Sequence, residues 1–185
     1  SVELFQKGVD LQQRGLFDHA IEEYEKALRL DPENLDILVN LGAACLQKGL
    51  AERAIKTLNQ ALTRDPGNTL VLYNLGKAYL YREDFESALK SFQRAYEITP
   101  ADNDIKKLIS KCLRLMGRYR ESVDLMLGLV DMIASDVRAL LELAGDLKML
   151  ERFDEALNIY RRASTVACDS IEPLIGIYDC QLRLG

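Results

Sequence analysis

The residues that could support catalysis or hold a metal are few in this 185-residue chain, and their spacing suits neither role. The sequence has four cysteines, no two of which form a C-x-x-C pair, and one histidine, His19. A zinc site needs several Cys or His ligands at short spacings, so neither a metal centre nor a cofactor is expected. The cysteines are interpreted as reduced thiols packed as small apolar groups, which favours a cytoplasmic location.

A second candidate for chemistry is the run Asp102-Asn103-Asp104, which has the acidic start of a calcium loop. However, Lys107 and Leu113 stand where such a loop needs glycine and glutamate. Asp102 and Asp104 are therefore expected to cap the helix that follows. The sequence also contains no G-x-G-x-x-G phosphate loop and no G-x-S-x-G nucleophile turn, so we do not expect an enzyme.

Three cations could form a binding site for an acidic group. Lys107, Lys111 and Arg114 follow one another at intervals of four and three residues, which places them on one face of a helix. Such a basic patch suits a carboxylate or a phosphate group. The alternative is that they form an ordinary solvated helix face.

The composition restricts the other classes of partner. Hydrophobic residues make up 48% of the chain and charged residues 29%, which predicts a packed fold instead of disorder. The net charge of −5 argues against nucleic acid and anionic membranes as partners. No apolar run approaches the roughly 20 residues that cross a bilayer, so membrane insertion is not expected.

A repeating framework must position these side chains, because the sequence has a period of 34 residues that starts at residue 1. Small residues recur at the eighth position of the period: Gly8, Gly42, Gly76, Ser110 and Ala144. Large apolar residues recur at the twenty-fourth: Tyr24, Leu58, Phe92, Met126 and Tyr160. Small residues let two helices cross closely, and large ones fill the space beside the crossing.

This pattern resembles the tetratricopeptide repeat, which favours leucine and glycine at its seventh and eighth positions, alanine at its twentieth and twenty-seventh, and proline at its thirty-second. Residues 69–102 meet it nearly in full, with Leu75, Gly76, Ala88, Ala95 and Pro100 at these positions. Tyr79 and Phe92 match as well, at the eleventh and twenty-fourth positions, where the repeat favours tyrosine and an aromatic residue. Repeats 1–34 and 35–68 match well. Repeats 103–136 and 137–170 are degenerate, because both lack the proline.

The resemblance implies an all-α fold, a right-handed superhelical solenoid of antiparallel helix pairs. Five repeats and a closing helix, 171–185, would form a single domain over 1–185. Helices are expected at roughly 2–14 and 17–30 in the first repeat and at the same offsets afterwards. Leu129 stands where a small residue is usual, so the fourth repeat is expected to be the loosest joint. The closing helix is either a polar end cap or the sign of a longer protein.

The resemblance also indicates where a ligand would bind. In the family, ligands usually meet the second, fifth, sixth, ninth, twelfth and thirteenth positions of the first helix of each repeat. Several of these positions carry apolar residues, and those predicted to bind a peptide are Phe5, Val9, Val39, Tyr73 and Tyr81. Exposed contiguous apolar surface usually marks a contact site. The alternative is that some of them pack against a neighbouring first helix.

Two amides and a fourth cation complete the predicted site. Asn40 and Asn74 occupy the sixth position of successive repeats, where a column of amides can hold a peptide backbone. The alternative is that both are generic consensus residues. Lys77 stands at the same repeat position as Lys111, so it would extend the basic patch inside the concave face.

These observations predict a non-catalytic scaffold or adaptor that binds a partner peptide or helix in a concave groove, with an acidic segment held by the basic patch. The residues by which similar repeat proteins grip chaperone C-termini are absent, since only one of five positions matches in either register. Two alternatives stay open. The chain could be the substrate-recognition or regulatory arm of a larger enzyme, such as a glycosyltransferase or methyltransferase, or a self-assembling scaffold that forms homo-oligomers.

Overall fold

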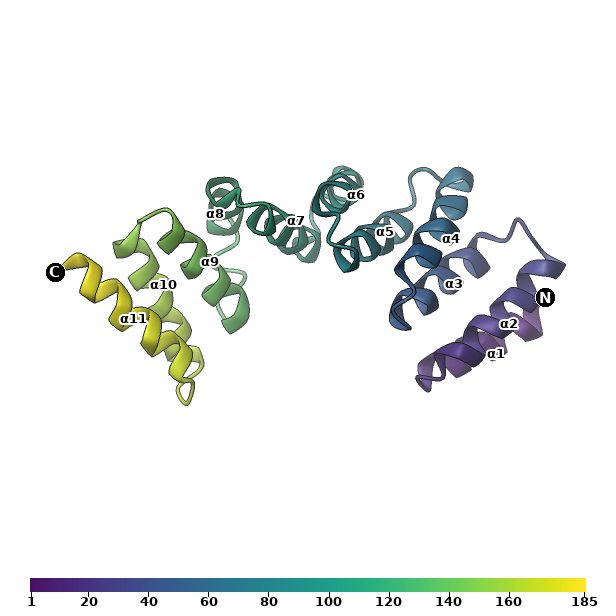
Figure 1. The fold of residues 1–185 in the computed structure, drawn as a ribbon, viewed down its shortest axis with the longest axis horizontal. Coiled ribbons are helices and arrows are strands. Elements are labelled where there is room, and N and C mark those ends of the chain that lie inside the picture. The colour runs from purple at the N-terminus through teal and green to yellow at the C-terminus, as the bar shows by residue number, and fades with distance from the viewer. The chain divides into compact units, whose positions relative to one another are not determined.

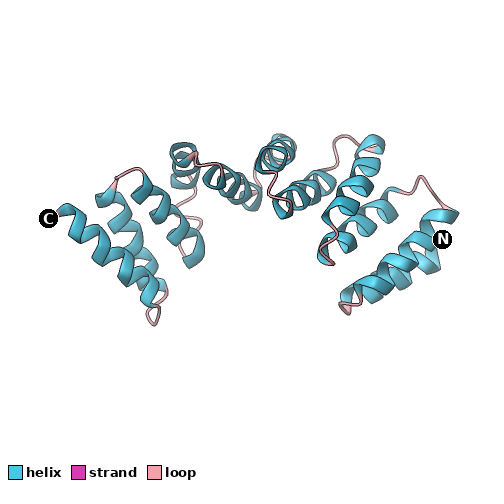
Figure 2. Cartoon of the chain, in the orientation of Figure 1, coloured by secondary structure: helices cyan, strands magenta, loops and turns pink.

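The computed structural model describes all residues 1–185 and consists of helices joined by short loops (Figures 1 and 2). The helices are α1 (Val2–Gln13), α2 (Phe17–Leu30), α3 (Leu35–Gln47), α4 (Ala51–Arg64), α5 (Thr69–Tyr81), α6 (Phe85–Ile98), α7 (Asn103–Leu115), α8 (Tyr119–Leu127), α9 (Val137–Met149), α10 (Phe153–Val166) and α11 (Ile171–Leu184). The predicted all-helical repeat is confirmed, and every helix except α8 ends close to its expected bounds.

By its internal contacts the chain divides into two compact units, Ser1–Ile105 (unit 1) and Lys106–Gly185 (unit 2). In unit 1 the helices pair as α1 with α2, α3 with α4, and α5 with α6, and successive pairs meet where α2 packs on α3 and α4 on α5. In unit 2, α9 packs against α8 and α10, and α10 packs against α11. The expectation of one domain over 1–185 stays a prediction.

Each helix pair of unit 1 crosses where a glycine faces a large side chain. The three contacts are Gly8 with Tyr24, Gly42 with Leu58, and Gly76 with Phe92. A Cβ atom added to any of these glycines would lie 2.5 or 2.6 Å from the facing side chain, which is fully buried. No larger residue fits at the crossing unless the two helices move apart.

The turn inside each repeat has one residue in the left-handed backbone region. Gly15, Gly49 and Gly117 occupy it with φ between 74° and 85°, as the sequence predicts. The same turn position holds Glu83 (φ 59°) and Glu151 (φ 58°) in the other two repeats. A side chain with a Cβ atom costs roughly 1–2 kcal/mol in this conformation. The packed helices on both sides therefore impose the turn on these two glutamates.

The fourth repeat departs from the expected pattern. A helix over 119–132 was expected, but α8 ends at Leu127, and turns occupy residues 128–135. The physical reason is Leu129, which is too large for the alanine position at a close crossing. The chain leaves the α-helix and buries Leu129 and Ile133 in the core of unit 2 instead. The expectation of a full second helix in this repeat is therefore wrong.

The glycine contact in α5 predicts the effect of Gly76→Ala. The new Cβ atom would lie 2.5 Å from the Phe92 ring, so the free energy of unfolding in urea should fall by about 1–3 kcal/mol. The control is Gly67→Ala in a loop, where the nearest atom would be Asp65 Oδ1 at 3.7 Å, and the change should stay within about 0.5 kcal/mol. Equal effects of the two changes would contradict the crossing constraint.

The early end of α8 predicts fast hydrogen exchange after it. Amides of residues 128–135 should exchange faster than those of α4, because turn hydrogen bonds such as Leu129 N–H to Met126 O open at lower cost than those inside a packed helix. Exchange followed by mass spectrometry on the whole chain would measure this. If residues 119–135 were the best protected segment of unit 2, the fourth repeat would not be a loose joint.

Candidate functional site

One face of α5 in unit 1 carries four of the predicted ligand contacts, more than any other helix. Leu70, Tyr73, Asn74, Lys77 and Tyr81 follow at helical spacing, and we name these five residues the α5 face. Leu70 is 57% exposed and Tyr81 is 64% exposed, although both have large apolar surfaces. Exposed apolar side chains gathered on one helix face are typical of a contact site.

Tyr73 is held in place at the centre of this face. Its ring meets the buried Phe92 ring edge-on, with centroids 6.1 Å apart. The Nζ atom of Lys77 lies 5.4 Å from the Tyr73 centroid, within the range of a cation–π contact. Beside the ring lies a hollow of about 390 Å³, lined by Thr69, Leu70, Tyr73, Asp102, Asp104 and Ile105. A ligand side chain could therefore contact a pre-positioned aromatic ring.

The two predicted amides differ in their hydrogen bonds. The Asn40 side chain donates to the backbone oxygen of Asp36 at 2.8 Å, within its own helix. Asn74 is only 8% exposed, yet its amide makes no hydrogen bond to the protein. Its polar atoms still reach solvent, since Glu23 Oε2 is the one fully buried side-chain polar atom without a partner. Of the two amides, Asn74 is therefore the one that the protein itself does not use.

Three of the predicted apolar contacts belong to the core of unit 1. Val39 is 7% exposed and lies within the buried cluster. Phe5 and Val9 are half-buried and pack against that cluster, and the Phe5 ring lies 5.9 Å from the Tyr24 ring between centroids. The alternative noted from the sequence, packing against neighbouring helices, describes these three residues better than an open ligand surface.

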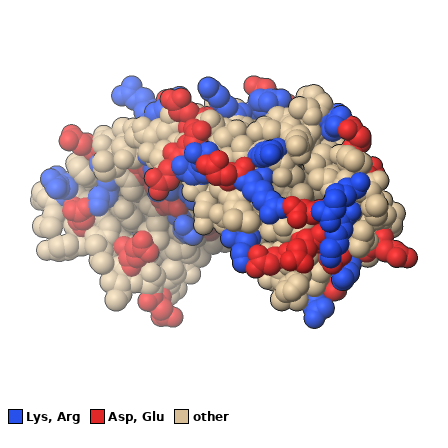
Figure 3. All heavy atoms as spheres, turned by 45° about the vertical axis from the view of Figure 1, so that its right-hand side comes forward, with Lys and Arg blue, Asp and Glu red and all other residues tan.

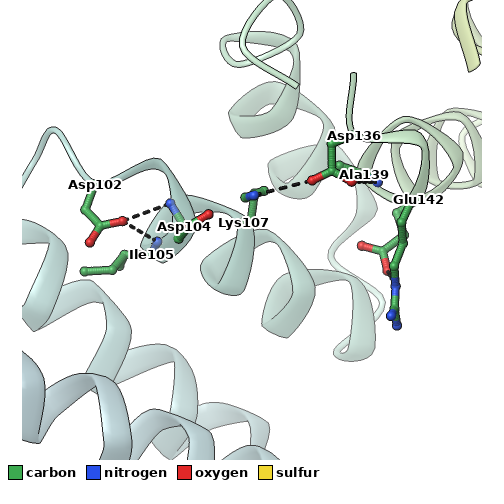
Figure 4. Close-up of polar contacts among 8 residues, drawn as sticks. Asp102, Asp104, Ile105, Lys107, Asp136, Ala139 and Glu142 are labelled. Atoms are coloured by element: carbon green, nitrogen blue, oxygen red, sulfur yellow. Dashed lines mark hydrogen bonds and ion pairs between the residues drawn. The ribbon is translucent and has the colours of Figure 1, made fainter. Parts of the chain in front are cut away.

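Two cations of the predicted basic patch already have acidic partners in unit 2. Lys107 Nζ lies 3.4 Å from Asp136 Oδ2 (Figure 4). Arg114 lies 3.0 Å from Glu142 and 3.7 Å from Asp146. Asp136 is the last residue of the same repeat, whereas Glu142 and Asp146 come from the next one. All three carboxylates neutralise charge that a ligand was expected to meet.

The other two cations keep more of their charge available. Lys111, in unit 2, is half-buried and makes no ion pair. Lys77, in unit 1, is exposed and contacts only the face of Tyr73. An acidic group on a partner would therefore find less free positive charge than the sequence suggests.

The acidic run before α7 acts as a helix cap. Asp102 Oδ1 accepts hydrogen bonds from the backbone N–H groups of Asp104 at 2.9 Å and Ile105 at 3.1 Å (Figure 4). The capping role expected for Asp102 is confirmed. Asp104 lies inside the first turn of α7 instead of capping it, so that part of the expectation is wrong.

A buried polar network in unit 2 was not predicted. Ser122 donates to Asp146 at 2.5 Å, and because its one proton is used there, Ser110 must donate to Ser122 across 2.9 Å. The two serines occupy positions that are glycine or alanine in the first three repeats. That double departure within one repeat is the signal that could have found the network.

Burial raises the pKa of the Asp146 carboxyl above its ordinary value. The hydrogen bond from Ser122 and the nearby Arg114 guanidinium act in the opposite direction. The carboxyl is therefore held in place by polar partners while its charge is disfavoured by the core around it.

A second hollow, of about 830 Å³, lies on the first-helix side of unit 2. It is lined by Arg114, Tyr119, Val137, Arg138, Leu141, Glu142, Gly145, Asp146, Lys148, Met149 and Glu172. In the degenerate fourth and fifth repeats only cations were predicted to meet a ligand, and the apolar residues of α9 were not. Their spacing of four residues was the available signal.

Surface charges mostly link neighbouring repeats. Figure 3 shows acidic and basic side chains interleaved on the visible face, without a broad area of one sign. Ion pairs in unit 1 join Lys48 to Asp18, Arg53 to Glu25, Arg64 to Glu33, and Arg82 to Glu52. Each exposed pair of this kind contributes little to stability. Because its two charges neutralise each other, such a pair also attracts a charged partner less than a single charge would.

Three of the four thiols are buried as expected, but Cys168 is exposed, so the expectation that it packs as an apolar group is wrong. No group of three or more His, Cys, Asp or Glu side chains could hold a metal ion. Burial raises the pKa of the Cys45 and Cys112 thiols to about 11, which keeps them protonated and unreactive. None of the helices has the length and apolar character to cross a membrane.

The buried carboxyl predicts a pH effect for Asp146→Asn. Because the pKa of Asp146 is raised on folding, the stability that it contributes is full below its ordinary value of 3.8 and is lost as the pH rises through the folded value. The asparagine cannot ionise, so the variant should gain free energy of unfolding relative to the unmodified chain from acidic to neutral pH. Urea denaturation across that range would measure the difference.

Ser122→Ala is the companion variant for this test. It removes the hydrogen bond that lowers the pKa of Asp146, so the loss of stability with rising pH should become larger. If the free energy of unfolding of Asp146→Asn instead fell relative to that of the unmodified chain as the pH rose, the carboxylate would be a net stabilising charge.

Comparison with known proteins agrees with this architecture. A crystal structure of MamA protein is similar at a TM-score of 0.82, with 23% identity over 89% of this chain and 90% of that chain. The structure described as YrrB, a TPR protein with an unusual peptide-binding site, has a TM-score of 0.80, with 21% identity over 92% of this chain and 88% of that chain. Such identities show the fold alone. The curated proteins contain no match.

The family is shown by two models described as tetratricopeptide repeat. One matches residues 5–69 and the other residues 52–112, so that together they cover more than half of the sequence. The helix pairs of unit 1, with their glycine crossings and left-handed turns, are the structural form of that match. The chain therefore belongs to the tetratricopeptide repeat family.

Proposed function

We propose that the chain is a non-catalytic scaffold that binds a peptide or helix of a partner protein through the α5 face of unit 1. The observation that carries this proposal is Asn74, an amide that is 8% exposed and has no hydrogen-bond partner. The amide reaches solvent and is not used within the protein, so it can offer both a donor and an acceptor to a bound backbone.

The neighbouring side chains suit a peptide. An amide donates and accepts at once, so Asn74 can bond a peptide N–H and C=O without reading the side chains. Leu70, Tyr73 and Tyr81 offer apolar and aromatic surface on either side of it. Lys77 can meet an acidic residue of the partner. Support comes also from a chain of the same fold, YrrB, whose description names a peptide-binding site.

The alternatives from the sequence remain predictions. Neither an enzyme arm nor a self-assembling scaffold is tested by the contacts of the α5 face. An acidic partner segment keeps support from Lys77 and Lys111, and less from Lys107 and Arg114, since these two already face carboxylates within unit 2.

Asn74→Ala tests the proposed function. Short random peptides displayed in a library are selected on the unmodified chain, and the affinities of the best binders are then measured by fluorescence anisotropy. The variant should weaken binding about fivefold to tenfold, which corresponds to one lost hydrogen bond. Its stability should be nearly unchanged, because the amide makes no hydrogen bond within the protein.

Asn40→Ala is the matched control. Its amide already donates to Asp36 O, so a loss of about twofold or less is expected. Equal effects of the two variants would remove Asn74 as the contact. A library that yields no binder sensitive to any residue of the α5 face would reject the site.

A further inference from the structure

The glycines inside helices divide into two kinds. Four of them have a steric reason, because a Cβ atom would lie only 2.4 to 2.6 Å from a neighbouring side chain; they are Gly8, Gly42, Gly76 and Gly176. Gly145 has none, since a Cβ atom there would meet nothing within 4 Å. A glycine in a helix interior costs about 1 kcal/mol relative to alanine. The α9 helix therefore carries a destabilising residue that its own packing does not require.

Gly145 lies in the middle of an apolar row. Val137, Leu141, Gly145 and Met149 follow every fourth residue along α9, and all four line the hollow of about 830 Å³. Leu141 is half-buried and Met149 is 62% exposed. We name these four residues the α9 row. The missing side chain leaves a gap between two flexible apolar side chains that could close around a guest.

The charges around the hollow are largely satisfied within unit 2. Arg114 faces Glu142 and Asp146, and Arg138 lies 3.4 Å from Glu142. Lys148 forms an ion pair with Asp179. No cluster of free cations is left for an acidic ligand.

The remaining charge favours the opposite kind of partner. Glu172 lines the hollow, is exposed and makes no ion pair. A basic residue on the partner would meet an unpaired carboxylate there. The volume lies within the range of sites that bind small ligands and peptide side chains.

We propose that the hollow over Gly145 binds a segment of a partner protein in which one large apolar side chain, Leu, Met or Phe, is accompanied by a Lys or Arg. The apolar side chain fills the gap in the α9 row, and the basic residue faces Glu172. This is a second site, in unit 2, and it uses no residue of the α5 face.

The variant Gly145→Leu tests this proposal by filling the gap from the protein side. Short random peptides displayed in a library are selected on the unmodified chain. We expect one class of binders to share a large apolar residue with a nearby Lys or Arg. Gly145→Leu should weaken this class about tenfold or more, as should replacing the apolar residue of the peptide by alanine.

Asn158→Leu is the matched control, because it adds the same side chain to an exposed position of α10 outside the hollow. Its affinity for the same peptides should match that of the unmodified chain. Glu172→Gln should weaken the class selectively, through its basic residue. Asn74→Ala should leave the class unaffected, so that a failure here is separable from a failure of the α5 face.

Stability measurements keep the test interpretable. Gly145→Ala should raise the melting temperature by about 2–4 °C, because alanine favours the helix and meets no neighbour. It should also cause a smaller loss of affinity than Gly145→Leu. The proposal is overturned if Gly145→Ala and Gly145→Leu bind the peptides as the unmodified chain does. It is equally overturned if no peptide class with an apolar and a basic residue is selected.

Discussion

The close crossing of two helices within each repeat is the constraint on which the structure depends. At Gly76 the absence of a side chain brings α5 against the Phe92 ring, and this contact fixes which side of α5 is buried. Leu70 and Tyr81 are left exposed, and Tyr73 lies at the edge of the buried side, with its ring against Phe92. Between α10 and α11, Gly176 and the Tyr160 ring make a contact of the same kind. The surfaces proposed to bind a partner are thus a consequence of how the hairpins close.

Much of the fold could be predicted because the period repeats the local chemistry of each helix and turn. The early end of α8 could not be predicted, because it depends on whether Leu129 fits at a helix crossing, and only the packed structure defines that crossing. The ion pair of Arg114 with Glu142 was also out of reach, because repeat position alone does not say which charges of successive helices meet. For the same reason, the repeat position of Val39 predicted a ligand contact, whereas packing within unit 1 buries this residue.

The two units offer different chemistry to a partner. The α5 face combines an amide that the protein does not use with aromatic surface, which suits the proposed recognition of a backbone. The α9 row combines apolar side chains with an open gap and an unpaired carboxylate, which suits recognition of particular side chains. A general contact and a selective one are complementary, since the first contributes affinity for many sequences and the second distinguishes between them.

The glutamates at the turns have a consequence for how such chains diverge. Glu83 and Glu151 hold the left-handed conformation that Gly15 holds, although they favour it less. The turn keeps its form because the helices on both sides leave the backbone no other path. The turn therefore tolerates a residue that does not favour it, and its shape follows from the packing of the helices beside it. In the same way one fold can be specified by quite different sequences, as in the MamA protein structure with 23% identity and a TM-score of 0.82.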